Sequence, residues 1–159
     1  MIWLGIDPGI KGAVAALDRE GSLLWCVDMP VCATGVDGPV LRELLMEDCA
    51  FGGAVATVEH QIAMPRQGVK ATAKQHYGYG LICGVLDGLG ITRRTVEPRI
   101  WQRTMTKGFQ GGAKQRSMSA ARTRWPEASL TGPRGAALDG RADALNLAEY
   151  GRLTWGVKL

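Results

Sequence analysis

The sequence predicts an α/β fold, with a five-stranded mixed sheet flanked by helices, and three observations lead to this prediction. Three apolar runs near the N-terminus are separated by short glycine-containing turns, as in an antiparallel meander. A helical segment then leads into a fourth apolar run, and a helical crossover is typical of parallel strands. The 159 residues, 46% of them hydrophobic, are enough for one core. We therefore expect a single domain over residues 1–159.

Each element has its own local signal. Strands are expected where apolar residues run between turn residues, and helices where apolar residues recur every three or four positions. Pro98 opens a short helix, as proline does at a first turn. Proline and glycine mark loops at 29–38, 107–113 and 126–136. The expected strands are 2–7, 13–18, 22–28, 55–59 and 91–97, and the longer expected helices are 39–49, 68–89, 114–124 and 139–153.

The helix expected at 68–89 contains Gly78, Gly80 and Gly84. Each glycine lowers helix propensity by about 1 kcal/mol relative to alanine. Alternatively, these glycines allow another helix to approach closely, including one from a second subunit.

Composition excludes several classes of protein. A charged content of 21% is that of a soluble globular protein. No stretch approaches the roughly 20 apolar residues of a membrane span, and no signal peptide is recognisable, so we expect a cytoplasmic protein without a membrane partner. Four cysteines without CxxC spacing argue against a zinc cluster and are expected to be reduced. They are Cys26, Cys32, Cys49 and Cys83.

Charge is distributed unevenly along the chain. Residues 1–60 hold 3 Lys/Arg and 9 Asp/Glu, whereas residues 61–126 hold 12 Lys/Arg and 2 Asp/Glu. A basic run alone is often only a solvated face. Next to a group of acids that could bind metal, however, the basic block favours a polyanionic substrate.

Four carboxylates occupy positions that need a chemical explanation. Asp7 and Glu59 each end an apolar run, and Asp139 and Asp143 share one face of the last expected helix. A charge left in a core is costly, so such an acid is usually paired, neutralised or bound to metal. If that helix begins beside the strand ends, all four meet. Oxygen ligands of this kind suit two Mg²⁺ ions roughly 4 Å apart, with Asn146 as a supporting partner.

Most of these acids also have an ordinary alternative. Asp7 precedes Pro-Gly and could be a turn residue. Asp139 could cap the last helix, and Asp143 could pair with Arg141 or another surface base. Glu59 has no such alternative, since it ends a run without any other charge.

Three segments resemble, in order and spacing, the motif regions of RuvC-type Holliday-junction resolvases, most closely the small bacteriophage forms. They are Gly5-Ile6-Asp7-Pro8-Gly9, Val58-Glu59 and Asp139-Gly140-Arg141-Ala142-Asp143-Ala144-Leu145. The likeness covers nearly the whole chain, and no single motif is specific. It implies a ribonuclease-H-like fold, a homodimer, Mg²⁺ (for which Mn²⁺ can substitute) and paired nicks across a four-way DNA junction. It also implies that Asp7, Glu59 and Asp143 are the catalytic acids and that Lys114 contacts the scissile phosphate.

The chain departs from the bacterial members at two places. They have an acid or histidine three residues before the last aspartate, where this chain has Gly140, and its acid, Asp139, lies one residue earlier. They also often carry an aromatic residue shortly after the glutamate, at the junction centre. This chain has none there, so Ile62 or Met64 is the expected wedge between bases.

Together these features lead to one hypothesis, a magnesium-dependent crossover junction endodeoxyribonuclease acting in DNA recombination and repair. It would cut four-way or other branched DNA as a dimer, in the cytoplasm of a cell or of a phage host, with no small-molecule cofactor. Basic side chains would hold the DNA backbone without reading its sequence. They are Lys70, Lys74, Arg99, Arg103, Lys107, Lys114 and Arg116.

Three other classes remain as alternatives. The segment from Asp7 to Gly12 resembles the first phosphate loop of actin-like sugar kinases and ATPases, which need about twice this length. A ribosomal-RNA-processing nuclease of the same superfold would cut linear RNA in preference to a junction. A non-catalytic junction-binding protein would bind the junction and leave it uncut in Mg²⁺.

Overall fold

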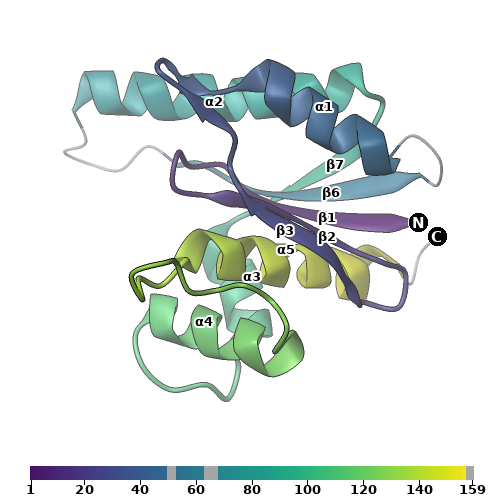
Figure 1. Ribbon diagram of the computed structural model, residues 1–159, viewed down its shortest axis with the longest axis vertical. Helices are drawn as coiled ribbons and strands as arrows, with labels where there is room; N and C mark the ends of the chain where they lie inside the picture. The colour runs from purple at the N-terminus through teal and green to yellow at the C-terminus, as the bar shows by residue number, and fades with distance from the viewer. Residues whose placement is uncertain (50–52, 63–67, 157–159) are drawn as a thin grey trace.

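A computed structural model describes residues 1–49, 53–62 and 68–156, and its main feature is a five-stranded mixed sheet between two layers of helices (Figure 1). The strand order is β3-β2-β1-β6-β7. β1, β2 and β3 are antiparallel neighbours, whereas β6 lies parallel to both β1 and β7. The predicted mixed sheet is therefore confirmed. The bounds are Ile2–Asp7 for β1, Ala13–Leu17 for β2, Leu23–Asp28 for β3, Ala54–Glu59 for β6 and Thr92–Val96 for β7.

Two sets of helices cover the two faces of the sheet (Figure 1). One core packs α1 and α2 against Leu4 and Ile6 of β1. The other packs α5 and α4 against Trp3 of β1 and its neighbours. The alternation of these side chains along β1 follows from the two-residue period of a strand. The helices are α1 (Gly38–Cys49), α2 (Val69–Gly88), α3 (Pro98–Met105), α4 (Ala113–Arg124) and α5 (Asp139–Trp155).

The position of α5 depends on glycines that let two backbones approach each other. A Cβ atom added to Gly5 of β1 would overlap the backbone oxygen of Ala144 in α5. One added to Gly140, in the first turn of α5, would overlap the backbone oxygen of Lys11. The first turn of α5 is therefore held beside the turn that follows β1.

The expected element boundaries are correct to within two residues, but the 29–38 loop contains regular structure that was not expected. Its residues form a short antiparallel hairpin, β4 (Val31–Cys32) and β5 (Gly35–Val36). The hairpin is closed by a hydrogen bond from the Asp37 N–H to the Pro30 oxygen, 2.9 Å long. Gly35 has a φ of 143°, a conformation that favours glycine.

The glycines of α2 differ in their surroundings. Gly78 packs against Val36 of β5, and a Cβ atom added to this glycine would lie 3.4 Å from a methyl group of the valine. At Gly80 and Gly84, a Cβ would meet nothing within 4 Å in the described part of the chain. Within the described residues, therefore, no other helix packs closely against these two glycines.

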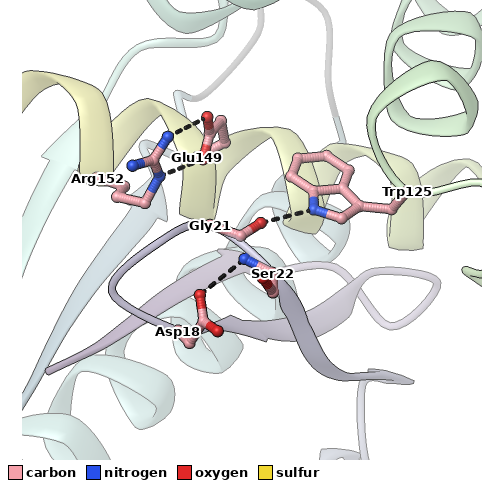
Figure 2. A network of polar contacts seen from close by, with 6 residues as sticks. All are labelled: Asp18, Gly21, Ser22, Trp125, Glu149 and Arg152. Carbon is pink, nitrogen blue, oxygen red and sulfur yellow. Dashed lines mark hydrogen bonds and ion pairs between the residues drawn. The ribbon is translucent and has the colours of Figure 1, made fainter.

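Polar contacts attach the β2–β3 turn to the face of the sheet that α4 and α5 cover (Figure 2). The indole N–H of Trp125, which follows α4, donates a 3.0 Å hydrogen bond to the Gly21 oxygen. Arg152 lies against Gly21 and donates two hydrogen bonds, 2.7 and 2.8 Å long, to Glu149. These contacts fix the end of the molecule opposite the carboxylates. None of the helices described here is long and apolar enough to pass through a membrane.

Candidate active site

The two strand-end carboxylates lie side by side at one edge of the sheet. In the parallel pair of β1 and β6, Ile6 is opposite Val58. Asp7 and Glu59 are the next residues of the two strands, so they lie next to each other. Ile6 and Val58 are both buried in the core under α1 and α2. Because side chains alternate along a strand, Asp7 and Glu59 lie on the other face, which α5 covers.

α5 brings the other two acids to the same place. Asp139 is its first residue, and Asp143 lies one turn later. The negative charges of Glu59, Asp143 and Asp139 all act on Asp7 and raise its pKa. The fold therefore places the four carboxylates at the same end of the sheet, where their charges act on one another.

The pKa values of three of these acids are displaced upward. Burial, followed by the charges of its neighbours, raises the pKa of Asp7 to about 8. Burial and the charge of Asp143 raise the pKa of Glu59 to about 7. Burial also raises the pKa of Asp143 to about 6. Both causes disfavour the ionised form. Without a cation these acids retain protons that isolated carboxyl groups would lose.

Asp139 differs because a lysine neutralises it. The Lys114 Nζ lies 2.5 Å from the Asp139 Oδ2, and this hydrogen bond holds the pKa of Asp139 below its usual range. The Lys114 side chain is 82% exposed, so it can turn towards another anion. Asp139 is not the cap of α5, because Leu138 occupies the N-cap position and makes no side-chain hydrogen bond there.

A chain of hydrogen bonds built around the buried Ser117 and Asn146 holds Asp143. The Ser117 hydroxyl group, on α4, donates to the Asp143 Oδ1 and lowers its pKa. The Asn146 Nδ2 donates to the Ser117 Oγ, 3.0 Å away, and to its backbone oxygen, 3.1 Å away. Arg124 completes the chain by donating a 3.2 Å hydrogen bond to the Asn146 Oδ1. Asn146 thus supports the site, as expected, but through Ser117.

Glu59 is oriented by a residue that the sequence did not point to. The indole N–H of Trp101, on α3, donates a 3.1 Å hydrogen bond to the Glu59 Oε2. Trp101 is fully buried, so this partner has little freedom to move. The bond lowers the pKa of Glu59, against the effect of burial.

The donor set fits a divalent cation. Asp7, Glu59 and Asp143 form no ion pair within the described residues, and Arg141 pairs with Asp28 at 2.6 Å instead of with Asp143. Among the described residues, no three His, Cys, Asp or Glu side chains are already positioned to hold one metal ion together. Burial, followed by repulsion between the acids, raises the pKa values of Asp7 and Glu59, and a cation among the carboxylates would favour their ionised forms. Carboxylate oxygens are also the ligands that Mg²⁺ prefers.

The predicted DNA-binding cations are divided between the two faces of the sheet, and only Lys114 contacts the carboxylates. Arg99 pairs with Glu97 at 2.7 Å, and Arg116 donates to the Gly111 oxygen at 3.0 Å. Ile62, one of the two expected wedges, is 46% exposed, and Met64 lies outside the described residues. The cations are Lys70 and Lys74 on α2, Arg99 and Arg103 on α3, Lys107 after α3, and Lys114 and Arg116 on α4.

The mixed sheet and its five helices define the ribonuclease-H-like fold of RuvC. A structure of Thermus thermophilus RuvC in complex with a Holliday junction substrate matches with a TM-score of 0.68 and 18% identity, over 99% of this chain and 97% of that chain. A second Thermus thermophilus RuvC structure matches with a TM-score of 0.63 and 21% identity, over 96% of each chain. No protein-family model and no curated protein matches the sequence. At these identities, the likeness shows the fold.

Proposed function

We propose that this protein is a magnesium-dependent endonuclease that cuts four-way or other branched DNA as a homodimer. The observation that carries the proposal is the meeting of Asp7, Glu59 and Asp143 at the strand ends beside the start of α5. Burial raises the pKa values of all three acids, and a bound cation would offset that effect by favouring their ionised forms. The RuvC fold, seen on a Holliday junction in a Thermus protein, supports this class of substrate.

The four acids would together hold the Mg²⁺ ions in this proposal. Asp7, whose pKa responds to the other three acids, would be the central ligand. Glu59 and Asp143 would be ligands beside it, with Asp139 completing the set. When bound, the ions supply an activated water and stabilise the leaving oxygen of the phosphodiester.

The protein's own groups prepare the site before substrate arrives. Trp101 and the Ser117 hydroxyl group orient Glu59 and Asp143 through their hydrogen bonds. Lys114 holds Asp139 in the free protein, and its exposed ammonium group would turn to the scissile phosphate. The remaining basic residues would hold the DNA backbone, which makes binding weaken as salt concentration rises. A dimer would place two such sites on opposed strands of one junction.

A cleavage assay tests the proposal. Purified protein is incubated with Mg²⁺ and matched four-way, three-way and linear DNAs, with linear RNA in parallel. We expect the branched DNA to be cut, and Asp7→Asn to bind it without cutting. The matched control is Glu127→Gln, an exposed acid away from the site, which should cut like the wild type.

Other results would change the assignment. If Asp7→Asn cuts at the wild-type rate, the proposed site is wrong. If linear RNA is cut in preference to junctions, the protein is an RNA-processing nuclease. If junctions are bound and remain intact in Mg²⁺, the protein is a non-catalytic binder whose acids are structural.

A further inference from the structure

A cavity of ≈ 270 Å³ lies beside the carboxylates, on the opposite face of the sheet. Its walls come from the turn after β1, the β4–β5 hairpin, the segment following β6 and the first half of α2. Pro8 of its lining directly follows Asp7, and Gln61 lies two residues after Glu59. The carboxylates face α5, whereas the cavity faces α2. The cavity and the carboxylates therefore share one edge of the sheet, at the turn that follows β1.

The lining has the composition of a small-molecule site. Most of it is apolar, including Ile10, Val36 and Ala71. Lys74 is the charged residue among the described lining residues, and no carboxylate is present among them. Mostly apolar walls with a few polar groups are typical of sites that bind small organic ligands. A positive charge without a negative one favours a ligand attached to phosphate.

Two side-chain amides are among the polar groups of the lining, together with Thr34 and Lys74. The Gln75 Nε2 donates a hydrogen bond to the Gln61 Oε1, so a residue after β6 is joined to α2. An amide carries both donors and an acceptor oxygen. These groups match the edge of a nucleobase, as glutamine does with adenine in DNA complexes.

Tyr77 gives the cavity an exposed aromatic border. Its side chain is 67% exposed, whereas other residues of the same helix are buried against the sheet. A single exposed aromatic residue needs no special explanation. One that borders an apolar cavity beside an amide pair and a lysine is placed to stack on a base. Such stacking is common where proteins bind unpaired strands.

We propose that this cavity receives one unstacked base of the strand whose phosphate lies at the carboxylates. Tyr77 stacks on the base, the Gln61–Gln75 pair contacts its edge, and Lys74 lies near an adjoining phosphate. The inference rests on the proposed function, because it requires branched DNA at the carboxylates. Branched DNA has unpaired or weakly stacked bases at its centre, where extrusion costs least.

A binding experiment with the full-length protein tests this in the absence of metal, so that cleavage does not interfere. The probes are four-way junctions with one abasic site, moved in turn through the three nucleotides on each side of the cut, and one intact junction. We compare the wild type with Tyr77→Ala and Tyr77→Phe. Val69→Ala is the matched control, since Val69 is 85% exposed on the same helix and outside the lining.

On the intact junction, Tyr77→Ala should bind about tenfold more weakly than the wild type, as expected for one lost stacked base. At one abasic position, both proteins should bind equally, because the base that Tyr77 contacts is missing. Tyr77→Phe and Val69→Ala should bind like the wild type.

Two results would overturn the inference while leaving the proposed function intact. One is equal binding of the intact junction by Tyr77→Ala and the wild type. The other is a constant ratio between them at every abasic position. If the wild type neither binds nor cuts branched DNA, the proposed function fails and this inference fails with it.

Discussion

Replacing Asp7 with asparagine should stabilise the metal-free protein near neutral pH, although it removes the central carboxylate of the site. The pKa of Asp7 is about 8 in the folded protein, against an ordinary value of 3.8. Between these two pH values, the folded protein retains a proton that the unfolded chain has released. Stability therefore falls as pH rises through this window. The asparagine side chain has no ionisable group and would not contribute to this loss.

The size of the effect follows from the displacement of the pKa. Each pKa unit corresponds to about 1.4 kcal/mol, and about three units apply at pH 7, so the upper bound is about 4 kcal/mol. Asp7 retains some solvent contact, which reduces the expected gain from Asp7→Asn to about 3 kcal/mol. For a protein of this size, that is a rise in Tm of about 6–10 °C.

Thermal unfolding followed by circular dichroism at pH 4, 5.5, 7 and 8 measures this effect. In EDTA, the Tm of Asp7→Asn should exceed that of the wild type at pH 7 and match it at pH 4, where Asp7 is protonated in the folded protein. Mg²⁺ should raise the Tm of the wild type but not of Asp7→Asn, because a ligand that binds only the folded state stabilises it. Glu127→Gln controls for the loss of one surface charge. Parallel pH profiles for wild type and Asp7→Asn would refute the reasoning.

Two further predictions concern the groups that orient the ligands. Ser117→Ala removes the hydrogen bond that lowers the pKa of Asp143, so that pKa should rise. Binding of Mn²⁺, measured by isothermal titration calorimetry, should weaken about tenfold at pH 6 and less at pH 8; an equal loss at both pH values would contradict this. Trp101→Phe removes the hydrogen bond to Glu59 and should raise its pKa, so the pH at which Mn²⁺ binding is half-maximal should move upward. An unchanged midpoint in folded Trp101→Phe would count against an orienting role.

The strand-end acids were predictable because their signals are local. A run of apolar residues that stops at a carboxylate identifies the strand and also the end of the strand that carries the functional group. Asp7 and Glu59 could therefore be placed at strand ends before the fold was known. The i, i+4 spacing of Asp139 and Asp143 likewise follows from helix geometry. The pairing of Asp7 with Glu59 depended on one further step, the parallel crossover, and the register of β1 and β6 confirms it.

The partners of these acids were not predictable in the same way. Ser117 lies 26 residues from Asp143, and Trp101 lies 42 residues from Glu59. A serine in a basic helix and a tryptophan in a short one have many possible neighbours. One partial signal existed for Ser117, since it follows Lys114 by three residues and so shares its helix face.

The sequence by itself determined the helices and the strands of the main sheet, their order and the carboxylates at their ends, because burial periodicity and turn residues act over a few neighbouring positions. Only the tertiary structure decided which side chain orients each acid, that Lys114 neutralises Asp139, and that a cavity forms beside the turn after β1. These features arise where backbones approach closely, as at Gly5 against α5, and where segments distant in the chain share one edge of the sheet. Their geometry depends on the packing of the whole chain, which local patterns do not encode.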